Sequence, residues 1–243
     1  MLLPERSRFY LCAVTAATAA AAYFLWCAPS EAPLSDDEEE AVERLRERAL
    51  LPFDAANETH VALLHTLWAR AFPERPLPAP RGAHWGDLGW QGHDPATDLR
   101  AAGHLAATAL VYFAERHTAA FQRLLMKSDG ARSAWEYPFA VGGVNLVAAL
   151  VDALGVAALL PKRAKGAAPP PPNRSFAALQ ARHPHAFEEL FCAAFIRLDA
   201  EWLTAKASYM DFNDICGRAV AAALAALDAG DDIASVCAAL TRV

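Results

Sequence analysis

The sequence has few of the residues that β-strands favour. Its 243 residues include only 12 valines, 3 isoleucines and 12 glycines, against 57 alanines. Strands are enriched in β-branched and aromatic side chains, whereas alanine has the highest helix propensity. Apolar residues make up 55% of the chain and charged residues 21%, a balance that excludes global disorder. The composition therefore argues against an all-β fold and predicts an all-α protein.

The sequence also has no excess of positive charge. The formal net charge is −6, and six acidic residues lie in one short stretch, residues 31–40. The other 22 acidic residues equal the 22 lysines and arginines in number, so the rest of the chain is neutral. Because nucleic-acid binding depends on neutralising many phosphates with basic side chains, we expect no nucleic-acid partner.

Cysteine, histidine and glycine are too scattered to form a recognisable catalytic or metal-binding motif. The five cysteines are odd in number and show no CxxC spacing, and the eight histidines show no HExxH motif. Phosphate loops of the GxxxxGK type, GxSxG elbows and dinucleotide fingerprints are also missing. We expect no disulfide framework, no metal site and no cofactor bound by the chain itself, and we interpret the cysteines as small buried hydrophobic residues.

Residues 9–28 form a long apolar run without a charged side chain, FYLCAVTAATAAAAYFLWCA. As a helix, 20 residues span about 30 Å, the thickness of the hydrocarbon core of a bilayer. Three interpretations stay open: a membrane anchor, a cleaved signal or organelle-targeting peptide, and a buried helix of the folded domain. We expect the chain on the cytoplasmic face of an internal membrane or in the cytoplasm, with organelle targeting as the alternative.

The chain divides by composition into three parts. We predict an apolar N-terminal segment over residues 1–30, an acidic linker with a helix start over 31–40, and one helical domain over 41–243. Four consecutive prolines cannot be helical, so residues 161–174 are expected to form an exposed Pro-rich loop within that domain.

Helix-start signals recur along the chain. Ser35 and Glu38 have the spacing of a capping box, and Asp94-Pro95 places a capping acceptor before a proline at the first helical position. The helix that starts there is expected to reach His117. The spacing of apolar residues predicts helices over residues 35–51, 57–71, 94–117, 138–160, 211–229 and from 184 onward.

One stretch of sixteen residues, WGDLGWQGHDPATDLR, concentrates two tryptophans, three glycines and a single arginine. It resembles the ELMO domain (engulfment and cell motility), whose pattern runs Trp, Gly-Phe-Gln-Gly and Pro-x-Thr-Asp-Phe-Arg-Gly. Trp90 and Leu99 replace the two phenylalanines of this pattern, and Ala101 replaces the glycine after the arginine. The matching residues are Trp85, Gly89-Trp90-Gln91-Gly92 and Pro95-Ala96-Thr97-Asp98-Leu99-Arg100-Ala101.

Three further segments are similar to the family pattern, in the same order along the chain. They are LVYFAERH around Tyr112, YPFAVGGVN over residues 137–145, and a C-terminal part with Phe187, Leu190, Trp202 and YMDFN over residues 209–213. The chain is therefore identified as similar, over about residues 40–230, to the ELMO-domain-containing, GTPase-activating branch. The resemblance implies a single multi-helix ELMO-type domain.

The resemblance also implies that the chain stimulates GTP hydrolysis by an Arf-family or Arf-like small GTPase. It would act as a regulator, with Arg100 as the catalytic residue, an arginine finger supplied in trans. A guanidinium stabilises the negative charge that spreads over the phosphoryl oxygens during transfer. GTP and Mg²⁺ would be bound by the partner. Residues implied as partner-binding or supporting are Trp85, Gly89, Gln91, Gly92, Asp94, Thr97, Asp98, His104 and Asn145.

Simpler structural roles stay open for the same arginine. On a helical wheel, Arg100 shares a stripe with His104 and Val111, from which it could project toward a docked partner. A lone arginine on a helix is also typical of a solvated or ion-paired surface residue, and Asp94 or Asp98 could pair with it.

The other residues have structural alternatives too. Trp85 and Trp90 are typical of aromatic residues that anchor a loop in the core, and Gln91 could form hydrogen bonds inside its own turn. Asn145, which follows two glycines, is interpreted as a buried polar residue satisfied by the backbone, or as a brace for the helix that carries Arg100. Helix-start chemistry accounts for the polar residues of the stretch, Asp94 and Thr97.

Two other functions stay open. Relatives of the ELMO domain in engulfment signalling act as scaffolds beside DOCK-type exchange factors and supply no arginine, so a scaffold that binds a small GTPase or such a factor is the alternative. A divergent domain that binds a GTPase without activating it is the third, because Ala101 stands where close approach of a partner could require glycine.

Overall fold

The computed structural model describes residues 33–100, 102–130, 136–159 and 170–242, and these residues form helices and turns without a strand. The all-α prediction is therefore confirmed. The chain divides after Leu34, and every helix described below belongs to the unit Ser35–Val243. The apolar run at residues 9–28 lies outside the described residues. Within the described part of the chain, no helix is both long enough and apolar enough to cross a membrane.

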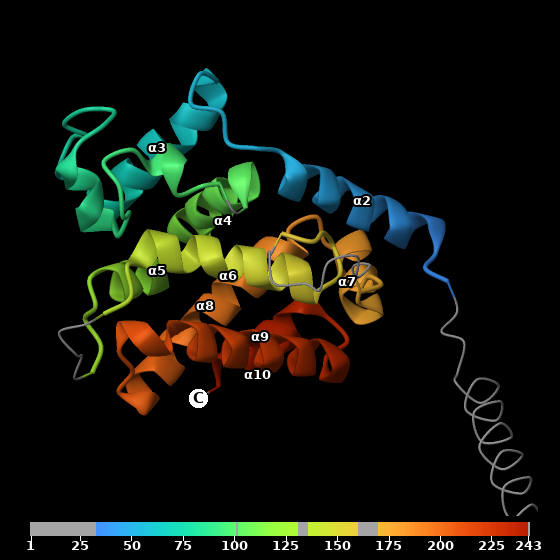
Figure 1. Ribbon diagram of the computed structural model, residues 1–243. Helices are drawn as coiled ribbons and strands as arrows, with labels where there is room; N and C mark the ends of the chain where they lie inside the picture. Colours follow the sequence, from blue (N-terminus) through green and yellow to red (C-terminus); the bar gives the residue numbers. More distant parts are fainter. Residues whose placement is uncertain (1–32, 101, 131–135, 160–169, 243) are drawn as a thin grey trace, which may run out of the picture. The chain divides into compact units, whose positions relative to one another are not determined.

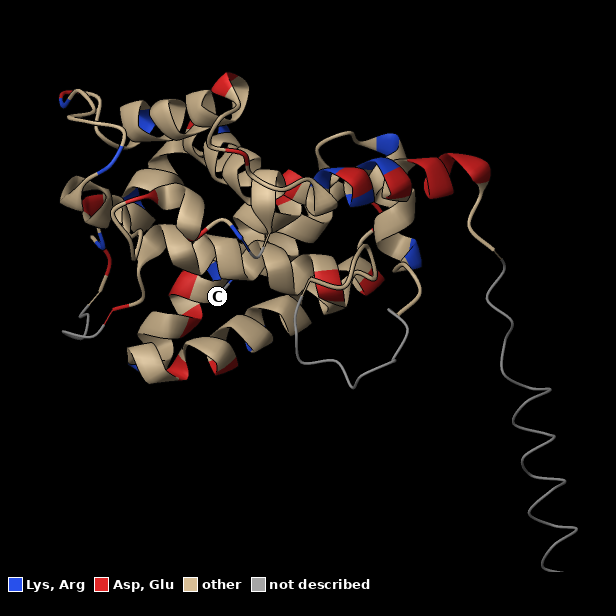
Figure 2. Cartoon of the chain, turned by 45° about the horizontal axis from the view of Figure 1, so that its top comes forward, with Lys and Arg blue, Asp and Glu red and all other residues tan. Residues whose placement is uncertain are grey.

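The first two described helices begin where the sequence predicts. Helix α2 (Asp36–Leu50) begins after Ser35, and the side chains of Ser35 and Glu38 form the predicted capping box. Acidic residues fill the first turn of α2 and Arg48 lies in its last turn, an order that complements the helix dipole (Figure 2). Helix α3 (Glu58–Ala71) begins after Asn57, whose side chain accepts a hydrogen bond from the backbone amide of Thr59 at 2.9 Å.

Helix α6 (Phe139–Ala153) is apolar along most of its length and packs against α4 (Gly103–Arg116), α8 (Ala186–Ala205) and α9 (Phe212–Ala229) (Figure 1). It ends seven residues before the predicted boundary at 160. The chain turns there because the amide of Val156 bonds back to the carbonyl of Val151, at 3.1 Å, in place of a further helical turn.

Helices α8 and α9 lie beside each other in the C-terminal half, and both match predictions. Five apolar residues of α8 at helical spacing are all buried: Phe187, Leu190, Phe191, Ala194 and Leu198. Three short helices were not predicted, because eight or nine residues carry too few turns for a clear apolar stripe. They are α5 (Thr118–Leu125), α7 (Arg174–Arg182) and α10 (Ile233–Thr241). Of the predicted Pro-rich loop at residues 161–174, residues 161–169 lie outside the described residues, residues 170–173 are not helical, and Arg174 is the first residue of α7.

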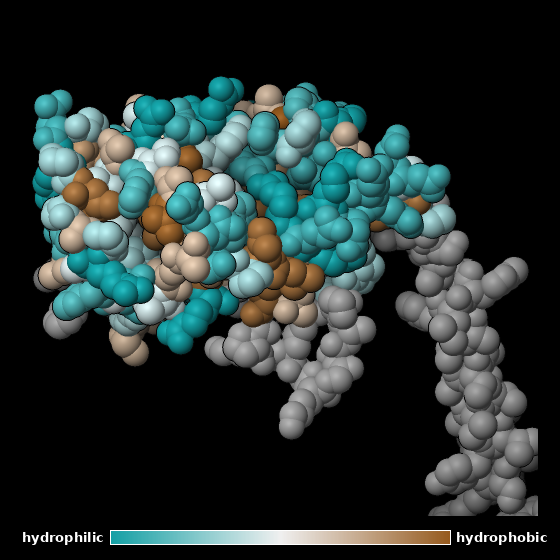
Figure 3. All heavy atoms as spheres, turned by 90° about the horizontal axis from the view of Figure 1, so that it is seen from above, coloured by the Kyte–Doolittle hydropathy of each residue, from teal (hydrophilic) through white to brown (hydrophobic). Residues whose placement is uncertain are grey.

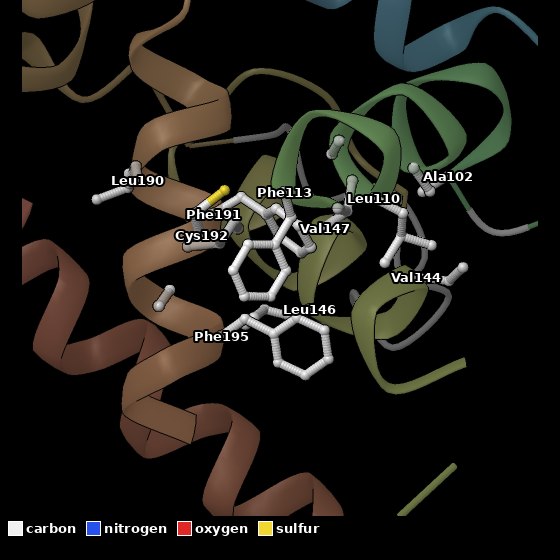
Figure 4. Close-up of a cluster of buried hydrophobic side chains, with 14 of the residues drawn as sticks. Ala102, Leu110, Phe113, Val144, Leu146, Val147, Leu190, Phe191, Cys192 and Phe195 are labelled. Atoms are coloured by element: carbon white, nitrogen blue, oxygen red, sulfur yellow. The ribbon is translucent and has the colours of Figure 1, made fainter. Parts of the chain in front are cut away.

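Aromatic side chains join these helices into one core. Figure 4 shows Phe113 of α4 close to Phe195 of α8, with Val147 of α6 between the helices. Phe139, at the start of α6, stacks on Phe195 with ring centroids 5.1 Å apart. Burying a phenylalanine contributes roughly 1.5–3 kcal/mol to stability, so this cluster firmly fixes α4 and the start of α6.

Three cysteines fall among the described residues and behave as predicted. Cys192 and Cys216 are buried, and Cys237 is half-buried. Burial raises the pKa of the Cys216 thiol to about 11, and burial together with the charge of Glu189 raises that of Cys237 to about 12. The raised pKa values favour the protonated thiols over the reactive thiolates.

The surface of the molecule is mixed in character. The face shown in Figure 3 carries mostly hydrophilic side chains, with a few apolar patches between them. Large hydrophobic side chains that are clearly exposed among the described residues are Leu50, Leu51, Met126, Tyr209 and Met210.

Candidate functional site

Two tryptophans anchor the loop that contains the ELMO-like motif. Trp85 lies in a short 3₁₀ helix, η1 (Ala83–Leu88), where it is buried and its indole donates a hydrogen bond to the carbonyl of Pro80 at 3.0 Å. Its ring packs edge-on against Trp68 of α3, and Trp90 is also buried. Both tryptophans therefore support the loop from within.

Gly89 fixes the same loop to the first turn of α6. Its φ is +84°, a left-handed conformation that suits glycine, and an added Cβ would lie 2.2 Å from the backbone nitrogen of Phe139. The carbonyl of Gly89 accepts a hydrogen bond from the amide of Val141 at 3.2 Å. The motif glycine is therefore explained by close packing of two backbones.

The second short helix of the loop, η2 (Pro95–Thr97), is capped by Asp94. One carboxylate oxygen of Asp94 accepts a hydrogen bond from the amide of Ala96 at 3.1 Å, and the other pairs with Arg81 at 2.6 Å. The Thr97 hydroxyl donates to the carbonyl of Asp94 at 2.8 Å. Asp94 is thus engaged in its own turn and with Arg81.

Asp98 closes the loop on itself. Its Oδ2 accepts hydrogen bonds from the backbone amides of Gln91, at 2.9 Å, and Gly92, at 3.3 Å. The backbone of the Gly-Trp-Gln-Gly segment is thereby tied to the turn that follows η2. Neither Asp94 nor Asp98 forms an ion pair with Arg100, so of the two structural alternatives only the solvated surface arginine stays open.

Arg100 is exposed on this turn. Its Nε donates a hydrogen bond to the carbonyl of Thr97 at 2.7 Å, and no carboxylate among the described residues lies within ion-pair distance of its guanidinium. The bond holds the Nε edge of the guanidinium against its own turn, and among the described residues Nη1 and Nη2 have no hydrogen-bond partner. The geometry therefore presents a positive group that the described residues do not neutralise.

The predicted helix over residues 94–117 is wrong in its first half. Only η2 forms at its start, and α4 begins at Gly103, whose φ is +49°. An added Cβ at Gly103 would lie 2.3 Å from the carbonyl oxygen of Leu51, and that same oxygen accepts a hydrogen bond from the amide of His104. Contact with Leu51 therefore interrupts the helix, and Arg100 lies on a turn before it.

His104 does not share a stripe with Arg100. Its ring packs on the ring of His60, with centroids 4.5 Å apart, toward the interior between α3 and α4. Burial, followed by the charges of His60 and Arg48, lowers the pKa of His104 below its ordinary value. His104 is therefore half-buried and packed against α3, and sequence periodicity misplaced it because the helix starts later.

A groove of about 200 Å³ lies beside the Gln91 end of the loop, and three distant segments line it. The side-chain amide nitrogen of Gln91 lies 3.5 Å from the hydroxyl oxygen of Tyr209, which belongs to the short helix η3 (Tyr209–Asp211). Gln91 therefore bonds across the groove through its side chain and within its loop through its backbone amide. The lining residues are Gln91, Pro138, Val141, Gly142, Asn145, Tyr209, Met210, Phe212 and Asn213.

Asn145 belongs to this groove, and its predicted burial is wrong. It is exposed on α6, because the stripe of α6 on which it lies faces the groove and not the core. No hydrogen bond joins Asn145 to the described residues of the Arg100 turn. Periodicity did not reveal the groove, although its three segments are those that carry the family resemblance.

The sequence model of the ELMO/CED-12 family matches residues 43–216. That range includes the Arg100 turn and all three segments of the groove. The chain belongs to the ELMO/CED-12 family. The resemblance seen in the sequence is thereby confirmed at the level of the family.

Relatives of this ELMO/CED-12 chain carry the domain in their names. ELMO domain-containing protein A of Dictyostelium discoideum is 31% identical over 179 residues, which cover 69% of this chain and 18% of the relative. ELMO domain-containing protein 1 of Pongo abelii is 30% identical over 190 residues, which cover 72% of this chain and 54% of the relative. ELMO domain-containing protein 2 of Mus musculus is 37% identical over 105 residues, which cover 43% of this chain and 34% of the relative. The chain thus spans about half or less of the length of these relatives.

In this ELMO/CED-12 chain, the described residues hold no group of three side chains suited to a metal ion. A second cavity, of about 500 Å³, shares Asp94 and Ala96 with η2 and is otherwise lined mainly by apolar side chains such as Phe53, Val61 and Trp85. The chemistry that the candidate site itself offers is one exposed guanidinium beside an uncharged groove.

Proposed function

We propose that this chain is a GTPase-activating protein for a small GTPase of the Arf family, and that Arg100 enters the partner's nucleotide site. The exposed guanidinium of Arg100, held at Nε and not neutralised by the described carboxylates, is the observation that carries the proposal. Membership of the ELMO/CED-12 family supports it, because the sequence resembles the GTPase-activating branch at this turn.

The chemistry requires little else from this chain. The transferring phosphoryl group spreads negative charge over its oxygens, and a planar guanidinium offers two parallel donors to them. GTP and Mg²⁺ would be held by the GTPase, which accords with the missing phosphate loop in this sequence. Arg100 would therefore act only when the two proteins are in contact.

The turn limits the conformational freedom that Arg100 loses on docking. Two hydrogen bonds to Asp98 and one from Nε of Arg100 hold the turn before any partner arrives. Each immobilised long side chain costs roughly 0.5–1.5 kcal/mol on association, so partial ordering of Arg100 beforehand reduces this cost.

Single-turnover GTP hydrolysis by a panel of purified Arf-family GTPases tests the proposal. With wild-type chain we expect stimulation of at least one member, and Arg100→Ala should lower that stimulated rate by roughly 10³-fold or more. Arg100→Lys should recover little of it, because an ammonium cannot donate two parallel hydrogen bonds. Arg44→Ala is the matched control, since Arg44 is an exposed arginine on α2 that pairs with Glu40.

Two results would overturn the proposal. One is stimulation by Arg100→Ala equal to that of wild type, which removes the side chain from the mechanism. The other is an absence of stimulation across the panel together with binding of a DOCK-type exchange factor, which assigns the chain to the scaffolding alternative.

A further inference from the structure

Among the described residues, Met210 is the most exposed large hydrophobic side chain, and its neighbour Tyr209 is exposed as well. The relative exposure of Met210 is 85% and that of Tyr209 is 49%, although both are large and apolar in part. They occupy η3, at the edge of the groove that Gln91, Asn145 and Asn213 also line. Exposed methionine and tyrosine beside a hollow are typical of the anchors of a protein interface.

The local structure holds these two side chains outward. Asp211 Oδ2 accepts hydrogen bonds from the backbone amide and hydroxyl of Ser208, at 2.8 and 2.9 Å, and these bonds close the η3 turn. The ring of Phe212 packs on the rings of Tyr137 and Trp202, with centroids 6.2 and 6.4 Å apart. The turn is therefore fixed on both sides, and an anchor on a fixed turn loses little entropy on binding.

The composition and size of the groove favour a protein side chain as its occupant. All nine lining residues are uncharged, as in the centre of a protein interface, where charged residues are depleted. Of the two acidic residues adjacent in sequence to the lining, Asp211 is directed back to Ser208 and Asp214 pairs with Arg218 at 3.6 Å. A volume of about 200 Å³ is smaller than the roughly 300–1,000 Å³ of typical small-molecule pockets.

Gln91 connects the groove to the Arg100 turn. Gln91 contributes its side chain to the groove, where its amide meets the Tyr209 hydroxyl, and its backbone amide to the carboxylate of Asp98. Arg100 follows two residues after Asp98. A partner that receives Arg100 therefore docks at a turn that Gln91 connects to the groove.

From this connection we infer that the groove with Tyr209 and Met210 is the docking surface for the small GTPase, which seats an apolar side chain between Met210 and α6. The inference rests on the proposed function for the identity of the partner. It separates two tasks: the η3 anchors and the groove supply affinity, and Arg100 supplies rate.

Binding and hydrolysis measured on the same variants test this separation. The partner is a purified Arf-family GTPase that the wild-type chain stimulates, loaded with a non-hydrolysable GTP analogue for binding and with GTP for hydrolysis. Met210→Asp should weaken Kd at least tenfold, because it places a charge in an uncharged contact. Arg100→Ala should leave Kd within about threefold of wild type while it abolishes stimulation. Met126→Asp is the matched control, since Met126 is also exposed, at 53%, and does not line the groove.

Asn213→Arg is a second groove variant and should weaken Kd in the same way, so the test does not depend on the folding of one protein. Wild-type affinity in both groove variants overturns the docking surface, whatever Arg100→Ala does. If the groove variants lose affinity while Arg100→Ala still stimulates hydrolysis, the docking surface stands and the catalytic proposal fails. If binding that depends on Met210 is found only with a second copy of the chain or an exchange factor, the GTPase assignment is overturned.

Discussion

Asp98 Oδ2 accepts a hydrogen bond from the backbone amide of Gln91 at 2.9 Å. The bond joins two residues seven positions apart, and the amide of Gly92 bonds to the same oxygen at 3.3 Å. Asp98 does not touch the guanidinium of Arg100, yet it fixes the backbone from which Arg100 projects. The two hydrogen bonds that Asp98 accepts therefore close the loop.

Removal of the two hydrogen bonds at Asp98 should change both stability and activity. We expect Asp98→Ala to lower the free energy of unfolding by about 1–3 kcal/mol, because two hydrogen bonds to a charged acceptor are lost. Stimulated GTP hydrolysis should fall as well, since the Arg100 turn becomes less ordered. Urea denaturation and the hydrolysis assay measure the two effects. Asp98→Asn keeps one acceptor oxygen, so it should lose less stability and less activity than Asp98→Ala. Wild-type values of both quantities for Asp98→Ala would show that the two hydrogen bonds have no role.

Gly89 and Gly86 provide a matched pair for the packing of the loop on α6. Gly89→Ala should destabilise the fold by about 2 kcal/mol or more, because its positive φ and the backbone of Phe139 both oppose a side chain. Gly86 has no atom within 4 Å of an added Cβ, so Gly86→Ala should change stability by less than about 0.5 kcal/mol. Thermal or urea unfolding of the two variants measures this difference. Equal stabilities would contradict the close contact between Gly89 and the backbone of Phe139.

His104 should make stability depend on pH. Its pKa is lowered in the folded chain, chiefly by burial and then by His60 and Arg48, so the unfolded chain binds more protons once the pH falls below about 6.5. The stabilisation is fully present above that pH, and it decreases as the pH falls through 6.5 toward the lowered pKa. Urea unfolding between about pH 5 and pH 7.5 should therefore show a steeper loss in wild type than in His104→Gln.

The control for this prediction is His93→Gln, because His93 is an exposed histidine of the neighbouring loop. It should follow the pH profile of the wild type. A His104→Gln profile that coincides with both would remove His104 as the source of the pH dependence.

The sequence predicted best what short-range interactions determine. The caps of α2 and α3 depend on residues within three positions, and Ser35, Glu38 and Asn57 therefore gave both starts correctly. The start of α4 depends on the carbonyl of Leu51, about fifty positions away, and no local signal announces it. For this reason the helix was expected nine residues too early, and Arg100 was assigned to the wrong kind of element.

The candidate site shows the same difference between short-range interactions, which the sequence predicts, and long-range contacts, which it does not. The turn chemistry of Asp94 and Thr97 was evident from the sequence, because a capping carboxylate acts within its own turn. The exposure of Asn145 was not, since it depends on which side of α6 is left open by η3. Only the family resemblance points to residues 209–213, because the hydrogen bond between Gln91 and Tyr209 spans 118 positions.

The groove unites the loop before η2, the start of α6 and the turn η3, none of which is close to another along the chain. As a result, it is a conformational epitope. Linear peptides copied from any one segment reproduce only a third of it, and antibodies raised against denatured chain recognise other features. A reagent meant to block this face has to be selected against the native domain, and a chain cut short before η3 leaves no complete target.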